Sequence, residues 1–263
     1  MDRISRALEM ARNKVTKVHE SPELEPGKPV EYTKTPSVSL ETEFLRQNRI
    51  MTGVDDGSIV DIYGLLRTRV LKLMKQNNWK TLGITSPNPS AGKTVTAINL
   101  SISVAQDQNY SALLVDADLR KPGVSKTLGI NPEFGLSDYL TDNKMLEDIF
   151  LHPEISHLVL VPTCPVSGGS SELLSSPRMT KFVEQAKERY PERIVMFDLP
   201  PILVGDDVVA LSQHLDALLL VVEDGKTQSD ELMRATDLLQ DVNLIGVVLN
   251  KASIAENQPE YYY

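Results

Sequence analysis

The stretch that decides the fold is residues 81–94, TLGITSPNPSAGKT. Its first five residues form a short β-prone run, and the helical pattern of the following segment begins at its end. A strand that passes through a loop containing Gly92 and Lys93 into a helix is the context that a phosphate-binding loop requires. Backbone N–H groups at the start of such a helix supply positive potential for a phosphate. The stretch therefore predicts a nucleotide-binding α/β domain.

We expect the nucleotide to be held mainly by this loop. Gly92 lets the backbone approach phosphate closely, although Pro87 stands where such loops usually have their first glycine. The Lys93 ammonium is expected to reach the β- and γ-phosphates, and the Thr94 hydroxyl to ligate Mg²⁺. Asn250 follows the last predicted strand, where its amide suits either recognition of the base or a turn. The predicted nucleotide-binding residues are Ser90, Ala91, Gly92, Lys93, Thr94, Val95 and Asn250.

Two further apolar runs end in aspartates, residues 113–120 (LLVDADLR) and 194–198 (IVMFD). A carboxylate at the carboxyl end of a central strand faces the ligand crevice of an open α/β sheet. Asp116 and Asp118 lie two residues apart, so both carboxylates are expected on the same side. One of them is expected to bind metal and the other to accept a proton, and the sequence does not assign which. We predict catalytic roles for Lys93, Asp116, Asp118 and Asp198, and metal ligation by Thr94, Asp118 and Asp198.

Strands and helices alternate from Trp79 onward, which predicts a doubly wound, mostly parallel sheet. The expected strands are 80–85, 112–116, 158–162, 194–198, 217–222 and 244–249. The expected helices are 58–75, 93–106, 137–150, 177–189, 206–213 and 228–240. We expect the chain to have three parts. Residues 1–57 contain an amphipathic helix at 2–18 and a proline-containing polar linker. A P-loop domain at 58–250 and a flexible tail at 251–263 follow.

Composition excludes several classes of protein. The chain of 263 residues carries a formal net charge of −9, which argues against general nucleic-acid binding through counterion release. One cysteine excludes a disulfide framework. The longest strongly apolar run, Ala217–Val222, is far too short to cross a membrane, and no signal-peptide pattern is present. These features predict a cytoplasmic location.

The last three residues, Tyr261, Tyr262 and Tyr263, are candidate phosphate acceptors. The segment from Asn250 to Tyr263 has about 14 residues and spans roughly 45 Å when extended, enough to reach a neighbouring molecule. A frayed terminus whose tyrosines pack on the surface is the competing interpretation. Each phosphate would add about −1.5 to −2 charges, which should loosen an oligomer of this acidic chain.

Together, the P-loop, the run Asp116-x-Asp118-x-Arg120, the segment 198–201 (DLPP) and the terminal tyrosines resemble the bacterial tyrosine kinases (BY-kinases). The chain looks most like their stand-alone cytoplasmic CpsD/CapB type. The resemblance implies autophosphorylation in trans with ATP and Mg²⁺, within a ring of subunits. It also implies a membrane polysaccharide co-polymerase as activating partner, control of polysaccharide chain length and export, and peripheral attachment at the inner membrane through that partner.

The chain also departs from this family. Its members often carry Glu-x-x-Arg-x-x-Arg before the P-loop for ring contacts, whereas residues 61–67 here read DIYGLLR. Two other classes compete with a kinase. A MinD/ParA-like ATPase switch shares the fold, but many such proteins have a second lysine early in the P-loop, and residues 86–91 contain none. A non-catalytic adaptor is disfavoured by the full set of Lys93, Thr94 and aspartates.

Overall fold

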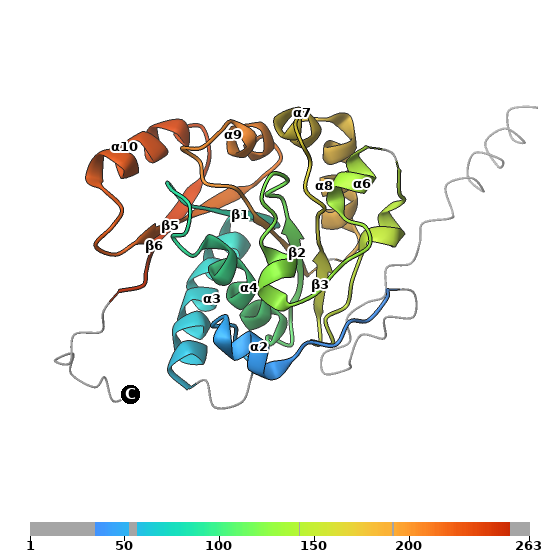
Figure 1. Ribbon diagram of the computed structural model, residues 1–263. Coiled ribbons are helices and arrows are strands. Elements are labelled where there is room, and N and C mark those ends of the chain that lie inside the picture. Colours follow the sequence, from blue (N-terminus) through green and yellow to red (C-terminus); the bar gives the residue numbers. More distant parts are fainter. Residues whose placement is uncertain (1–34, 53–56, 142, 191, 253–263) are drawn as a thin grey trace, which may run out of the picture.

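A six-stranded sheet runs through the middle of the computed structural model, which describes residues 35–52, 57–141, 143–190 and 192–252 (Figure 1). The strands lie in the order β3-β2-β4-β1-β5-β6, and every neighbouring pair is parallel. The predicted doubly wound fold is therefore confirmed. The strands are β1 (Thr81–Thr85), β2 (Ser111–Asp116), β3 (Leu158–Val161), β4 (Arg193–Asp198), β5 (Ala217–Glu223) and β6 (Leu244–Asn250).

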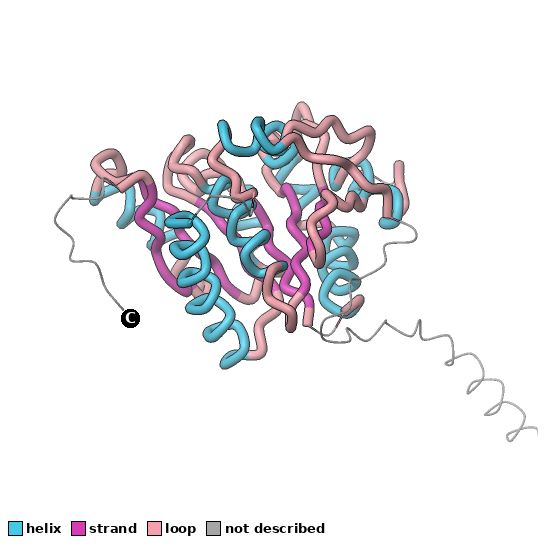
Figure 2. Tube along the Cα trace, turned by 90° about the horizontal axis from the view of Figure 1, so that it is seen from below, coloured by secondary structure: helices cyan, strands magenta, loops and turns pink. Residues whose placement is uncertain are grey.

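Helices cover both faces of the sheet, as Figure 2 shows from below. Successive residues of a strand point to opposite faces. In β2, Leu113 and Val115 therefore enter one core cluster, while Ala112 and Leu114 enter the other. Because every residue of β1 to β5 is buried, these strands lack the polar alternation of a half-exposed sheet.

One face carries α2 (Thr42–Gln47), α3 (Gly57–Asn77), α4 (Lys93–Ala105) and α5 (Val124–Leu128). The other carries α6 (Leu136–Leu140), the 3₁₀ turn η1 (Leu146–Ile149), α7 (Ser170–Leu174), α8 (Pro177–Glu188), α9 (Asp207–Ser212) and α10 (Ser229–Leu238). The expected helices at 58–75, 93–106, 177–189, 206–213 and 228–240 each correspond to one of these within two residues at either end. The short helices α5 and α7 were not predicted.

The helix expected at 137–150 is wrong, because the segment breaks after α6. The Thr141 hydroxyl donates to the Ser137 carbonyl at 2.9 Å and also accepts from the Asn143 amide at 2.9 Å. The chain then restarts at η1, where the Asp148 carboxylate accepts from the Met145 amide at 3.0 Å. Local side-chain hydrogen bonds thus compete successfully with a continuous helix.

Part of the expected linker is folded onto the domain. Leu45 on α2 is buried, and so are Ile50 and Met51 just after it. The Asn99 side chain on α4 holds this segment, since its amide donates to the Arg49 carbonyl at 2.9 Å and its oxygen accepts from the Met51 amide at 2.9 Å. The helix expected at 2–18 lies outside the described residues.

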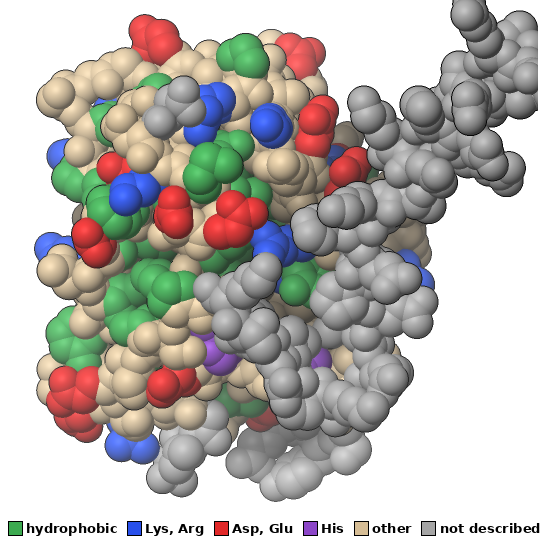
Figure 3. Space-filling model, turned by 90° about the vertical axis from the view of Figure 1, so that its right-hand side faces the viewer, with side chains coloured by type: hydrophobic (Ala, Val, Ile, Leu, Met, Phe, Trp, Pro, Cys, Tyr) green, Lys and Arg blue, Asp and Glu red, His purple; other side chains and the backbone are tan. Residues whose placement is uncertain are grey.

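The side of the molecule that ends in β3 carries mixed charges. Figure 3 shows acidic and basic side chains interspersed with apolar ones there, without a continuous basic patch in view. Within the described ranges, no helix is both long enough and apolar enough to cross a membrane.

Candidate functional site

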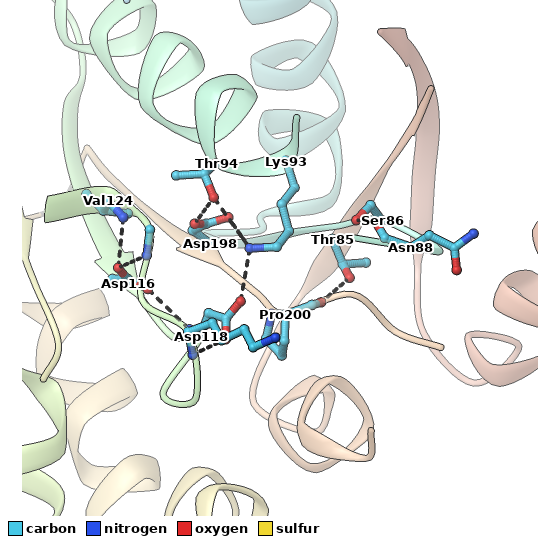
Figure 4. A network of polar contacts seen from close by, with 12 residues as sticks. Thr85, Ser86, Asn88, Lys93, Thr94, Asp116, Asp118, Val124, Asp198 and Pro200 are labelled. Carbon is cyan, nitrogen blue, oxygen red and sulfur yellow. Dashed lines mark hydrogen bonds and ion pairs between the residues drawn. The ribbon is translucent and has the colours of Figure 1, made fainter. Parts of the chain in front are cut away.

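Three neighbouring strands bring the predicted site residues to one edge of the sheet. In the β2-β4-β1 part of the sheet, Asp116 pairs with Asp198 and Asp198 pairs with Ile84. In this parallel register, the carboxyl ends of all three strands lie at the same level. The loop after β1 therefore begins beside Asp198, and the loop after β2 begins beside it on the other side. This register explains how residues about 80 positions apart in sequence meet (Figure 4).

The phosphate loop has an unusual backbone that neighbouring residues hold in place. Gly92 has φ +96°, and a Cβ added there would lie only 2.0 Å from the Asn250 amide nitrogen, so glycine is required. Ser90 has φ +66°, an uncommon value for a residue with a side chain. The Asn250 amide donates to the Ala91 carbonyl at 2.8 Å, and Lys251 donates to the Ser90 carbonyl at 2.7 Å. Asn250, the last residue of β6, and Lys251 just after it thus fix two successive carbonyls of the loop.

The Lys93 ammonium lies at the centre of the site (Figure 4). It is 3.2 Å from Asp118 Oδ2 and 3.5 Å from Asp198 Oδ1. The Thr94 hydroxyl donates to Asp198 Oδ2 at 2.6 Å. Lys93 and Thr94 are the first two residues of α4, so the start of this helix faces the same carboxylates. The arrangement gathers one cation, one hydroxyl and two carboxylates at the phosphate loop.

The two aspartates at the end of β2 have different surroundings, contrary to the expectation that both carboxylates lie on the same side. Asp116 is fully buried, and its Oδ2 accepts from the amides of Gly123 and Val124 at 3.0 and 2.9 Å. Its Oδ1 accepts from the Asp118 amide at 3.3 Å. Asp118 lines the open cavity beside Lys93, whereas Asp116 does not. Asp116 therefore shapes the loop that carries Asp118.

The site contains more buried carboxyl groups than cations. Burial by itself would lower the pKa of Lys93, but neighbouring carboxylates, first of all Asp198, outweigh burial and raise it. Burial raises the pKa of Asp116 to about 8, with repulsion from Asp198 adding to it and the Val124 amide opposing it. Burial also raises the pKa of Asp198, against the attraction of Lys93. A divalent cation beside these groups would reverse the shifts of the carboxyl groups.

The oxygen donors present fit Mg²⁺. The Thr94 hydroxyl and the Asp198 carboxylate lie in contact, Asp118 lines the same cavity, and Mg²⁺ prefers hard oxygen ligands. In the described part of the chain, no cluster of three His, Cys, Asp or Glu side chains could hold a metal ion by itself. Mg²⁺ usually keeps several waters and shares its remaining positions with substrate phosphates, so one or two carboxylates suffice.

A cavity of about 350 Å³ opens at the phosphate loop. Ser90, Gly92, Lys93, Thr94 and Val95 line it, as predicted for a nucleotide site, while Ala91 is buried behind the loop. Asn250 is not among the lining residues, and its amide contacts the loop instead. Its expected contact with the base is therefore not supported by this geometry.

Several residues that the sequence analysis did not assign to the site also line the cavity. They are Arg120, Lys121, Pro200, Pro201, Val204, Gly205 and Asp207. Arg120 and the two prolines belong to the motifs quoted above, and that membership was the available signal. Asp207 has no such signal, because its position follows from the packing of α9.

The predicted phosphate acceptors Tyr261, Tyr262 and Tyr263 lie outside the described residues. Two tyrosines of the described domain, Tyr63 and Tyr139, are further candidate acceptors. Tyr139 is only 5% exposed and its ring packs against Arg178, with the guanidinium 4.6 Å from the ring centroid. Tyr63 is half-buried on α3. Neither ring is freely accessible in the folded domain.

No protein-family model matches the chain. Among curated proteins, the tyrosine-protein kinase YwqD of Bacillus subtilis (strain 168) is 32% identical over 203 residues, which covers 76% of this chain and 84% of that protein. Further relatives are named CapB, from Staphylococcus aureus, and CpsD, from Streptococcus agalactiae.

Solved structures similar to this chain also include tyrosine kinases. The kinase domain of the Escherichia coli tyrosine kinase ETK has a TM-score of 0.72 and 27% identity, covering 87% of this chain and 93% of that one. The cell division ATPase MinD of Pyrococcus furiosus has a TM-score of 0.57 and 20% identity over 67% of this chain and 74% of that one, which is a likeness of fold alone. The comparisons therefore favour the kinases over the ATPase switches.

Proposed function

This chain belongs to the bacterial tyrosine-protein kinases, and we propose that it transfers the γ-phosphoryl group of ATP to tyrosines of its own C-terminal segment. The observation that carries the proposal is that Lys93, Thr94 and Asp118 line a cavity beside the phosphate loop, with the buried Asp198 in contact with Lys93 and Thr94. The proposed acceptors are Tyr261, Tyr262 and Tyr263 of a neighbouring copy.

In this proposal, the loop amides and Lys93 bind the phosphates, and the rigid loop keeps the γ-phosphoryl group in line with the incoming tyrosine. Thr94 and Asp198 would hold Mg²⁺, with Asp118 facing the same cavity, and the ion would neutralise charge on the phosphates. The Asp118 carboxylate, which lines the cavity, accepts the proton of the tyrosine hydroxyl. Asp116 is buried away from the cavity and keeps Asp118 in place through the Asp118 amide.

The cellular setting is proposed from the relatives. Proteins named CapB, CpsD and EpsB are among them. We infer that this kinase acts in the cytoplasm, at the inner membrane through a membrane polysaccharide co-polymerase that activates it. Phosphorylation of the tail then regulates the chain length and export of an exopolysaccharide, and the kinase domains assemble into a ring. We propose no nucleic-acid partner, given the net charge of −9.

The test is mass spectrometry of the purified chain after incubation with ATP and Mg²⁺. We expect phosphate on Tyr261–Tyr263 of the wild type and none on Lys93→Met. Loss of the Lys93 charge at the transferring group should lower the rate at least about 100-fold. ATP consumption without tyrosine modification would instead support an ATPase switch, and phosphate on Lys93→Met would refute the site.

A further inference from the structure

The Arg120 side chain is held by two buried groups that the proposed reaction does not use. Its Nε donates to Ser170 Oγ at 2.7 Å and lies 2.9 Å from Asp207 Oδ2. The Ser170 hydroxyl donates to Asp207 Oδ1 at 2.5 Å. Ser170 is 1% exposed and Asp207 2% exposed, whereas 48% of the Arg120 side chain is exposed. The Nε of the guanidinium is thus fixed, and its Nη2 lies 3.6 Å from Oδ1 of the exposed Asp206, while about half of the side chain stays accessible.

Three separate segments meet to make this contact. Arg120 follows β2, Ser170 is the first residue of α7, and Asp207 is the first residue of α9. Helices α7 and α9 lie side by side above the carboxyl ends of the strands (Figure 1). A Cβ placed on Gly205 would lie 3.6 Å from Arg120 Nη1, so this stretch of backbone passes close to the guanidinium.

The contact differs from an ordinary structural ion pair. A buried carboxylate needs hydrogen bonds to offset its desolvation. Asp116, the fully buried last residue of β2, takes three of them from the backbone amides of Asp118, Gly123 and Val124. Asp207 instead receives its hydrogen bonds from Ser170 and from Arg120, a side chain that lines the cavity. The Asp207 carboxylate therefore orients the Arg120 guanidinium beside the cavity.

We propose that Ser170 and Asp207 are positioning residues that hold Arg120 toward the cavity, where its terminal amino groups bind the phosphoryl group during transfer. The planar fork of arginine matches phosphate oxygens. Lys93 is shared between two carboxylates, so a second cation at the transferring group adds stabilisation that Lys93 does not supply alone. Preorganised donors of this kind act most strongly on developing charge. The inference rests on the proposed kinase reaction.

Steady-state kinetics of the full chain with ATP and Mg²⁺ test the proposal. We expect Arg120→Ala to lower kcat about 100-fold, and Asp207→Asn and Ser170→Ala about tenfold each. The KM for ATP and the affinity for ADP should change less than about twofold, because the nucleotide is held by the phosphate loop. Ser171→Ala and Asp237→Asn are matched controls on α7 and α10, and they should keep wild-type kinetics.

A double-variant cycle separates positioning from a general structural role. If Asp207 acts only through Arg120, then Arg120→Ala combined with Asp207→Asn is no slower than Arg120→Ala alone. Added guanidinium ion should restore part of the activity of Arg120→Ala and none of the double variant. Arg120→Lys should not restore activity, because it lacks the Nε–H that Ser170 and Asp207 bind.

Additive losses in the cycle, or guanidinium rescue that does not need Asp207, would overturn the inference. The thermal midpoint of each variant is measured alongside, and if Asp207→Asn unfolds, the cycle is run with Ser170→Ala. A wild type that phosphorylates no tyrosine would refute the kinase proposal itself. A wild-type kinase whose Arg120 variants keep full kcat would refute only the present inference.

Discussion

At the scale of single residues, Asn250 carries two competing interpretations. Its place at the end of the last strand suits contact with a base, yet its amide donates to the Ala91 carbonyl at 2.8 Å. A residue that supports the loop affects every nucleotide alike, whereas a residue that reads the base changes the preference among nucleotides.

We predict that Asn250→Ala weakens ATP and GTP binding by the same factor. Loss of one hydrogen bond to the loop is worth about 1 kcal/mol, or roughly fivefold in affinity. Isothermal titration calorimetry with both nucleotides checks this result. A selective loss of ATP affinity would instead assign Asn250 to the base.

Asp116 and Asp118 show what the sequence could and could not predict about single residues. Sequence spacing identified Asp116 and Asp118 as a pair at a strand end, and both lie at that end. It did not separate their roles, because the separation depends on the loop that returns to the α5 helix. The amides of Gly123 and Val124 bind Asp116, which leaves Asp118 at the cavity.

At the scale of elements, Asp216 joins the beginnings of two strands at the edge of the sheet opposite the site. Its Oδ2 accepts from the amides of Lys80 and Thr81 at 2.8 and 2.9 Å, and Oδ1 lies 3.2 Å from Lys187 Nζ. Burial by itself would raise the pKa of Asp216, but these hydrogen bonds outweigh it and hold the pKa below its ordinary value.

We predict that Asp216→Asn lowers the free energy of unfolding by about 1–2 kcal/mol at pH 7. Because the folded state has the lower pKa, the stabilisation is present above about pH 4 and is lost as the pH falls through the folded value. Urea unfolding between pH 7 and 3 measures this difference, with the exposed Asp237→Asn as control. A difference that stays constant over this range would contradict the prediction.

The strands and five of the helices were predictable, whereas the five-residue helices α5 and α7 were not. The strands are apolar runs covered on both faces, so composition and spacing mark them. Helices α5 and α7 have five residues each, too short for a periodic apolar pattern. They form because of what they pack against, and α7 carries Ser170. The contacts of Arg120 with Ser170 and Asp207 could therefore not be predicted from the sequence, although Arg120 itself belongs to a quoted motif.

At the scale of the whole molecule, α3 is the surface on which the proposed ring depends. Ile62 and Leu65 are 59% and 55% exposed on it. Arg67, the arginine retained from the ring pattern, donates to the Ser103 carbonyl of its own chain at 2.9 Å. Assembly of a ring stays a prediction, and so does the division into three parts.

We predict that phosphorylation occurs between molecules. A mixture of Lys93→Met, which keeps its tyrosines, with a variant in which Tyr261, Tyr262 and Tyr263 are all changed to Phe should yield phosphate on the Lys93→Met chain. Intact mass measurement distinguishes the two chains, and Lys93→Met alone serves as control. An unmodified Lys93→Met chain in the mixture would mean that transfer occurs only within a molecule.

The anchoring of Lys251 has a consequence for the geometry of any such assembly. Its ammonium is bound to the Ser90 carbonyl and to Glu223, 2.7 and 3.1 Å away, so the tail starts from a fixed point on the phosphate loop. Ten residue steps from there to Tyr261 span at most about 35 Å. The length of this segment therefore limits the assembly. Tyr261 can reach the cavity of a partner only if that cavity lies within this distance of the phosphate loop of the chain that carries Tyr261.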